Sequence, residues 1–326
     1  MSNTFKSLVF ASVASMVAAN TGFSQESVIH SSIEEKALAS IRLEGYPDWI
    51  ALDENSVWIS NEGINALQRI DARSQRLLAT IPINRPCAAS TIGFGSVWTI
   101  SCGDRTLVRI NQKTNRVEAT MPMSLASDEG SIVAAEDGVW VLSDKRGILT
   151  RVDPKVNRVI HEIRVKPNSF AVMAGFGSVW ITNTGEEGGD EPGSVQRIDP
   201  RTNNVIATIL VGRLPRFLAV GEGGVWTLNQ SDGSVTRIDP MTNQVVATIA
   251  CEVPGTGGDI AAGEGFVWVR AKNELLLKID PASNRVIEKF GPPAGSGAVR
   301  AGYGAVWLTA HDIFTLWKLD VKRKKK

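Results

Sequence analysis

GVWTLNQSDGSVTRIDPMTNQVVATI, residues 224–249, is one copy of a unit that recurs along nearly the whole chain of 326 residues. A period near 40 residues, with several short β-branched runs in each unit, is typical of the four-stranded blades of a β-propeller. Helical solenoids share this period, but they need apolar residues at a 3.6-residue spacing, whereas these units alternate. Seven Val-Trp pairs, 39 to 46 residues apart, mark the units at Trp58, Trp98, Trp140, Trp180, Trp226, Trp268 and Trp307.

Four strands are expected in this unit: strand A at residues 217–220, B at 225–228, C at 234–238 and D at 244–249. The Gly-rich turn at 221–224 supplies the positive φ that the A–B hairpin needs. Asp239-Pro240 starts the C–D turn, and Asn243 tolerates the left-handed conformation that returns the chain. We therefore interpret the repeated Trp, Asp and Asn residues as structural.

The two ends of the chain supply complementary parts of one blade. Residues 39–43 (ASIRL) stand one period ahead of Ala79-Thr80-Ile81, as a strand D with no strand A, B or C before it. The last unit ends after a strand C at 316–320. The sequence therefore predicts an all-β, seven-bladed propeller over residues 37–320, closed by the N-terminal strand D joining the C-terminal strands A–C. Closure leaves no open edge between the first and last blade.

The first 25 residues are expected to form a secretory signal peptide. Lys6 precedes an apolar run at 8–19, which is too short to span a bilayer as a helix. Residues 26–36 are expected to be a linker, and residues 321–326 a basic tail. These features predict a periplasmic or secreted protein, with no transmembrane segment after cleavage. A monomer is expected.

The cysteines and the net charge limit the remaining possibilities. Cys87 and Cys102 flank the A–B turn of blade two and should face each other across it, so an oxidising compartment favours a disulfide. Cys251 is then the odd thiol. The net charge of +1 makes nucleic acid an unlikely partner, because such binding needs a strong basic excess. Contact of the basic tail with DNA is the weakest alternative.

At these residues the chain resembles the YVTN-type β-propeller repeat family. Residues 179–183 (VWITN) and 197–203 (RIDPRTN) carry that family's pattern, and the resemblance covers about residues 37–320. It is specific for fold and weak for function, because such repeats serve many roles. Related propellers include the streptogramin B lyases, which use a metal held by His and Glu near the channel, and periplasmic propellers that bind DNA or protein partners. The resemblance thus implies a lyase or lactonase-type hydrolase as an alternative, with a divalent metal as cofactor.

Aligning the repeats on Trp exposes charged residues that break the pattern. Asp259 and Arg300 stand on strands A of neighbouring blades, at positions where the other blades carry uncharged residues. Arg270 follows Trp268 by two, and Asp48 and Arg216 each stand ten before a Trp. A charge at the channel must be paired or hydrated. An arginine cluster suits a carboxylate or phosphate ligand, whereas a structural ion pair is the alternative for Asp259 and Arg300.

His311 is the one histidine placed for acid–base or metal chemistry, on the mouth-side B–C loop of blade seven beside Asp312. A lyase-like site with two His ligands cannot be built from the expected mouth residues, which counts against streptogramin lyase activity. The B–C loop of blade four, residues 184–193, is lengthened and acidic. A Ca²⁺ loop, a flexible lid and an idle insertion all fit it, and the idle insertion is preferred.

The sequence therefore predicts a binding scaffold for a small anionic ligand or a protein partner at the channel mouth. The alternatives are a propeller enzyme with His311 as acid–base or metal-binding group, and nucleic-acid binding. The expected ligand-binding residues are Asp48, Arg216, Asp259, Arg270, Arg300 and Asp312.

Overall fold

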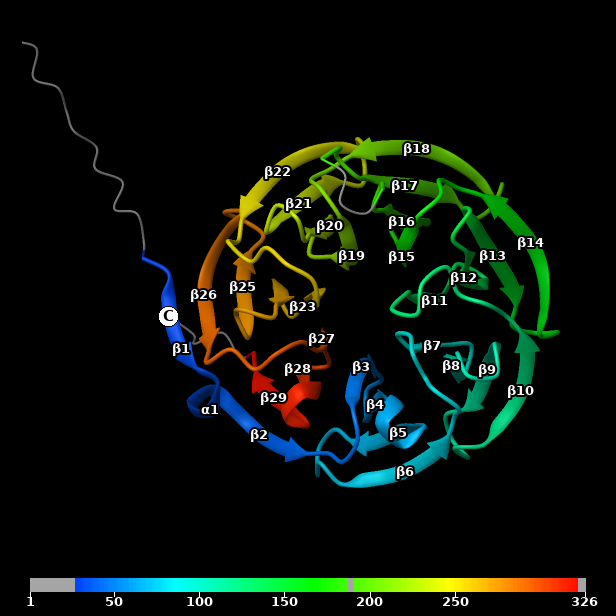
Figure 1. Cartoon of the computed structure of the whole chain (residues 1–326), viewed down its shortest axis with the longest axis horizontal. Coiled ribbons are helices and arrows are strands. Elements are labelled where there is room, and N and C mark those ends of the chain that lie inside the picture. Colours follow the sequence, from blue (N-terminus) through cyan, green and yellow to red (C-terminus); the bar gives the residue numbers. More distant parts are fainter. Residues whose placement is uncertain (1–26, 187–189, 322–326) are drawn as a thin grey trace, which may run out of the picture.

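A computed structural model describes residues 27–186 and 190–321, which form a ring of seven blades (Figure 1). The all-β, seven-bladed architecture predicted from the repeat is thereby confirmed. The expected signal peptide, the tail residues 322–326 and the centre of the acidic insertion lie outside the described residues. Within the described part of the chain, no helix has the length and hydropathy to cross a bilayer.

Each blade runs from strand A at the channel to strand D at the rim. Blade one contains β3 (Pro47–Leu52), β4 (Ser56–Asn61), β5 (Ala66–Asp71) and β6 (Leu77–Pro82). Blade two contains β7 (Thr91–Gly93), β8 (Ser96–Ser101), β9 (Thr106–Asn111) and β10 (Val117–Pro122). Blade three contains β11 (Ile132–Ala135), β12 (Gly138–Asp144), β13 (Ile148–Asp153) and β14 (Arg158–Arg164). Blade four contains β15 (Ser169–Gly175), β16 (Ser178–Asn183), β17 (Ser194–Asp199) and β18 (Asn204–Leu210).

The remaining blades follow the same order. Blade five contains β19 (Pro215–Gly221), β20 (Gly224–Asn229), β21 (Ser234–Asp239) and β22 (Gln244–Ala250). Blade six contains β23 (Asp259–Gly263), β24 (Phe266–Arg270), β25 (Leu276–Asp280) and β26 (Arg285–Gly291). Blade seven contains β27 (Val299–Gly302), β28 (Ala305–Ala310), β29 (Thr315–Asp320) and, from the other end of the chain, β2 (Ala37–Arg42). Two 3-10 turns, Glu62–Ile64 and His311–Ile313, lie in the B–C loops of blades one and seven.

The ring closes in blade seven as the sequence predicted. Strand β2 pairs antiparallel with β29, with Ile41 opposite Leu316 and Ser40 opposite Trp317. The backbone N–H of Leu43 extends the ladder with a 2.8 Å hydrogen bond to the carbonyl oxygen of Phe314. The outermost strand of this blade therefore comes from the N-terminus and its other strands from the C-terminus.

The stretch expected to be a linker contains two short elements that the repeat did not reveal. Strand β1 (Ile29–Ser32) pairs parallel with β26 as a fifth strand of blade six, and α1 (Ile33–Lys36) follows it on the rim (Figure 1). Ile33 is 1% exposed and belongs to one buried cluster with Trp268 of blade six and Trp317 of blade seven. Neither element has a counterpart in the other blades, so alignment of the units could not find them.

Adjacent blades are joined by an arginine on strand C. In the opening unit, Nη1 of Arg237 donates to the carbonyl oxygen of Pro281 at 2.6 Å and to Oδ1 of Asn284 at 2.8 Å. The same guanidinium lies 4.8 Å from the ring centre of Trp226. The turn asparagines thus bind the preceding blade as well as returning their own chain. The equivalent pairs are Arg69–Asn115, Arg109–Asn157, Arg151–Asn203 and Arg197–Asn243.

The contact between blades six and seven is built differently. Blade six carries Lys278 where blades one to five carry arginine. Blade seven has no C–D hairpin to receive an arginine, because its strands C and D come from opposite ends of the chain. The buried Ile33 side chain packs in the cluster shared by these two blades instead.

Candidate functional site

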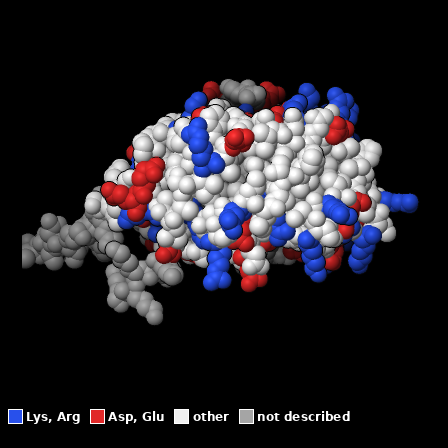
Figure 2. Space-filling model, turned by 90° about the horizontal axis from the view of Figure 1, so that it is seen from below, with Lys and Arg blue, Asp and Glu red and all other residues white. Residues whose placement is uncertain are grey.

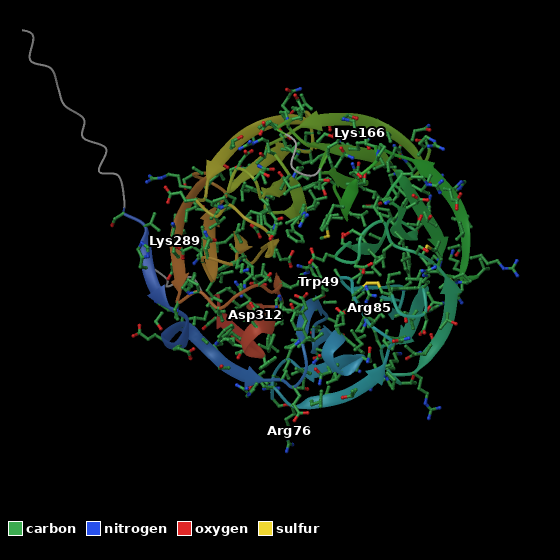
Figure 3. All side chains as sticks on the ribbon, viewed as in Figure 1. Trp49, Arg76, Arg85, Lys166, Lys289 and Asp312 are labelled. Carbon is green, nitrogen blue, oxygen red and sulfur yellow. A yellow bond between two sulfur atoms is a disulfide. The ribbon has the colours of Figure 1, made fainter. Side chains whose placement is uncertain are left out.

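The channel opens on one face into a cavity of about 290 Å³, here called the mouth pocket. The D–A connections and B–C loops form its walls, as the propeller topology predicts. In Figure 3, Trp49, Arg85 and Asp312 lie around the centre of the ring, whereas Arg76 and Lys289 lie at the rim. The pocket is lined by Tyr46, Asp48, Trp49, Glu62, Arg85, Cys87, Asp128, Glu129, Phe217, Gly257, Gly258, Ser296 and His311.

A second cavity of about 270 Å³ lies nearer the opposite face, where the A–B turns are. Its walls are mostly apolar side chains of strands A, among them Ile50, Ile92 and Met173. Arg300 and Tyr303 also line it. Most charged groups of the channel therefore lie at the mouth pocket.

The mouth pocket carries more negative than positive charge. Asp48, Glu62, Asp128 and Glu129 line it, against the single arginine Arg85. Nε of Arg85 lies 3.0 Å from Oε1 of Glu62, and its Nη2 contacts Asp128. The arginine is therefore neutralised by two of the carboxylates. This charge favours a cation, which is opposite in sign to the ligand expected from the sequence.

Arg270 does not line this pocket, because it is fully buried. Its Nε donates to the carbonyl oxygen of Thr309 at 3.1 Å, and its Nη1 donates to the carbonyl oxygen of Ala271 at 2.5 Å. A third donor, Nη2, reaches the carbonyl oxygen of Ala294 at 3.4 Å. Burial lowers the pKa of Arg270 to about 10, although Asp48 and Asp312 oppose this shift. The side chain holds blade six against blade seven.

Asp259 and Arg300 form an ion pair between strands A of these two blades. Asp259 is 3% exposed and also accepts the backbone N–H of Val299 at 3.1 Å. Burial raises the pKa of Asp259, and the Arg300 guanidinium opposes this shift. This arrangement fits the structural ion pair that the sequence analysis gave as the alternative to a ligand site. Arg216 lies apart from them, with its guanidinium 5.3 Å from the ring centre of Phe170.

Asp48 is the carboxylate of the mouth pocket with the strongest electrostatic perturbation. Burial, followed by the charges of Asp259 and Glu129, raises its pKa from 3.8 to about 7, and Arg270 opposes the shift. Within the described residues, its carboxyl group has no hydrogen-bond donor. An anionic carboxyl group without a donor is costly to bury, so the native state retains its proton up to near neutral pH.

Replacing Asp48 with Asn should therefore change how stability depends on pH. The native state keeps a proton that the unfolded state releases above pH 3.8, so the free energy of unfolding falls as pH rises from about 4 to 7. We expect Asp48→Asn to be more stable than the parent by on the order of 2 kcal/mol at pH 8, after a discount for partial exposure. Urea unfolding between pH 4 and 8 measures this difference. Parallel pH profiles for the two proteins would contradict it.

Tyr46, His311 and Asp312 form a hydrogen-bonded row at the edge of the pocket. Nδ1 of His311 lies 2.9 Å from Oδ1 of Asp312, and its Nε2 lies 3.2 Å from the Tyr46 hydroxyl. The Tyr46 and His311 rings also stack, with centres 4.1 Å apart. Burial lowers the pKa of His311 against the opposing effect of Asp312. Burial and nearby carboxylates, Asp48 first, raise the pKa of Tyr46 to about 12.

The cysteines are arranged for structure. Cys87, in the wall of the mouth pocket, is joined to Cys102 by a disulfide, with their Cα atoms 5.9 Å apart. Cys251 is buried, and burial raises the pKa of its thiol to about 12, against the opposing effect of Lys289. Such a thiol remains protonated and is a poor nucleophile.

The residues at the mouth do not fit the metal that a lyase-like site would hold. Over the described ranges, one group of three potential ligands lies close enough to share an ion: Cys87, Cys102 and Asp128. Two of these are bonded to each other through sulfur. His311 has no second histidine beside it, because His30 is on β1 at the rim and His161 is on outer strand β14.

Comparison with solved structures shows the fold. A streptogramin B lyase structure is 16% identical and superposes with a TM-score of 0.71, covering 86% of this chain and 96% of that one. Virginiamycin B lyase from Staphylococcus aureus is 16% identical, with a TM-score of 0.69 and coverage of 86% and 98%. Kuenenia stuttgartiensis hydrazine synthase is 10% identical, with a TM-score of 0.72 and coverage of 86% and 97%.

The fold-level resemblance to streptogramin B lyases is thus confirmed. No family model and no curated sequence matches the chain. At these identities the likeness concerns the fold, which hosts many activities.

The structure brings together only some of the residues singled out in the sequence. Asp48 and His311 line the mouth pocket, and Asp312 contacts His311. Arg270 and Asp259 are buried beside it. Sequence alignment missed Tyr46, Arg85 and Glu129, because the D–A connections that carry them have no common pattern to align. Their hydroxyl, guanidinium and carboxylate groups could have been found only by asking which irregular loops face the mouth.

Proposed function

We propose that this protein is an exported binding scaffold whose ligand or protein partner occupies the mouth pocket. The observation that carries the proposal is the pocket itself, a cavity of about 290 Å³ lined by charged and aromatic side chains from several blades. A closed ring holds such residues in fixed positions, which reduces the ordering cost of binding. The disulfide between Cys87 and Cys102 is typical of proteins in oxidising compartments and supports export.

Acid–base catalysis is the second candidate, and the row of Tyr46, His311 and Asp312 favours it. A carboxylate orients the histidine, and the histidine contacts a hydroxyl, as in sites where a base activates a nucleophile. The raised pKa of Tyr46 argues against a tyrosinate nucleophile. A binding role uses the same residues without requiring this step.

Nucleic-acid binding has less support. In the side view of the ring (Figure 2), basic and acidic side chains are interspersed, without a basic stripe on that face. Retention of the protein on immobilised DNA that does not depend on salt concentration would argue against a phosphate contact, whereas a steep salt dependence would support one.

A thermal-shift screen with small amines, carboxylates and phosphate esters tests the binding role. At least one class should raise the melting temperature of the parent protein. Glu129→Arg, which changes an exposed residue of the mouth pocket, should abolish that shift. The matched control is Glu54→Arg, on the exposed A–B turn at the opposite face, which should retain it. A shift lost equally in both variants, or in neither, would place the ligand elsewhere and contradict the proposal.

A further inference from the structure

We propose that the mouth pocket recognises a primary ammonium group, either of a free amine or of a lysine side chain, through a tyrosine hydroxyl fixed as a hydrogen-bond acceptor. This inference rests on the proposed binding role of the same pocket. It is carried by the row of Tyr46, His311 and Asp312 together with the Asp48 carboxyl group.

The direction of the hydrogen bonds in this row follows from Asp312, which lies at its outer end. The Asp312 carboxylate, whose side chain is 48% exposed, can only accept hydrogen bonds. Nδ1 of His311, 2.9 Å from that carboxylate, must therefore carry the ring proton. Nε2 is then the acceptor, and the Tyr46 hydroxyl donates its only proton to it across 3.2 Å.

A hydroxyl whose proton is engaged can only accept from a ligand. The Tyr46 oxygen therefore offers lone pairs to the mouth pocket, which suits an N–H donor and disfavours an anion. Burial lowers the pKa of His311, which keeps its imidazole neutral near pH 7 and preserves this polarity. The raised pKa of Tyr46 keeps the hydroxyl protonated.

Asp48 supplies the negative charge that an ammonium group needs. It lines the same cavity as Tyr46, and within the described residues no hydrogen-bond donor reaches its carboxyl group. A bound ammonium would give it a charge-assisted hydrogen bond. Glu129 and Glu62 of the pocket add to the negative potential that attracts a cation.

The apolar part of the pocket suits an alkyl stem. Trp49 and Phe217 line the cavity with their ring centres 5.9 Å apart, and both are largely buried. Aromatic faces attract cations as well as alkyl groups. A quaternary ammonium would use these faces and the carboxylates, but it has no N–H for Tyr46. The hydroxyl therefore distinguishes a primary from a quaternary amine.

Ligand-observed NMR titration at pH 8 with four probes tests this inference. The probes are n-butylamine, Nα-acetyl-lysine N-methylamide (whose side-chain amine is free), tetramethylammonium and butyrate. Tyr46→Phe should raise the Kd of the primary amine about tenfold, because it removes a hydrogen bond to a charged group while keeping the ring on His311. Binding of tetramethylammonium should not change. The chain has two tyrosines, so Tyr303→Phe at the opposite opening is the matched control and should leave every Kd unaltered.

The pH dependence gives a second measurement. Amine affinity should rise between pH 6 and 8 as Asp48 ionises, under the influence of Asp259, Glu129, Glu62 and Arg270 around it. Asp48→Asn should remove this rise, while His311 and Asp312 remain in place. If the lysine methylamide probe binds more tightly than n-butylamine, the ligand is the lysine side chain of a protein partner. If n-butylamine binds more tightly, the ligand is a free amine. Both results support the inference.

Three results would overturn it. Butyrate binding at the mouth without amine binding would leave the proposed binding role standing but reverse the charge of its ligand. Equal effects of Tyr46→Phe on primary and quaternary amines would remove the role of the hydroxyl. Binding of none of the four probes would overturn the inference, whereas the binding role itself is decided by the thermal-shift screen and its Glu129→Arg variant.

Discussion

Deletion of residues 37–43 is expected to cause the largest loss of stability among the changes considered, and to make the protein aggregate. These residues contain β2, which pairs with β29 from Ala37 to Arg42. Their removal exposes an open edge of blade seven and disconnects the N-terminus from the C-terminal strands. A sheet edge with unpaired N–H and C=O groups is a template for intermolecular pairing. Size-exclusion chromatography and thermal unfolding followed by circular dichroism measure both effects.

Deletion of residues 27–32 is the matched control for ring closure. It removes β1, the added strand of blade six, but leaves β2 and Ile33 in place. We expect a folded monodisperse protein with a melting temperature only a few degrees lower, corresponding to about 1 kcal/mol. An unchanged melting temperature after deletion of residues 37–43 would show that β2 is not needed to hold the ring.

Replacement of Arg270 with Met should lower the free energy of unfolding by about 3 kcal/mol at pH 8. Met fills much of the space, but the carbonyl oxygens of Thr309, Ala271 and Ala294 lose their donors. The variant also removes the cation that favours ionised Asp48, so the pKa of Asp48 should rise above 7. At pH 5.5 Asp48 is mostly protonated in the native state, so the loss should be smaller by about 1 kcal/mol.

Urea unfolding at the two pH values measures the effect of Arg270→Met. Arg270→Lys keeps the charge but not the planar fork of donors, and should fall between the parent and the Met variant. Arg76→Met, at an exposed rim position, is the control for loss of an arginine in general and should cost less than about 0.5 kcal/mol. If Arg270→Met were as stable as Arg76→Met, the buried arginine would not hold blades six and seven together.

The repeat predicted the blades closely because every blade is formed by the same pattern of strands and turns. The strands expected at 217–220 and 244–249 are present as β19 (Pro215–Gly221) and β22 (Gln244–Ala250). Alternation, Gly turns and Asp-Pro turns are local signals, and they act within a single blade. The arginine contacts between blades were missed because each joins residues more than 40 apart, although the arginines recur at a fixed position.

The site was harder to predict because a departure from the repeat shows that a residue is unusual but not what it contacts. Arg270 and Asp48 both break the pattern, yet one is fully buried and the other lines the mouth pocket. The sign of the charge at the mouth depends on Glu129 and Asp128, which lie on a D–A connection outside the aligned strands. Only the fold shows which loops meet.

The packing of Ile33 between blades six and seven has a consequence for the effect of temperature. Five other contacts between blades contain an arginine hydrogen-bonded to a turn asparagine, whereas this one contains a buried aliphatic side chain in a shared apolar cluster. Hydrophobic contacts weaken on cooling, because the entropic gain from releasing water diminishes. The Ile33 packing is therefore the part of the contact between blades six and seven that weakens on cooling, while the Arg270 hydrogen bonds and the Asp259–Arg300 ion pair still join the two blades.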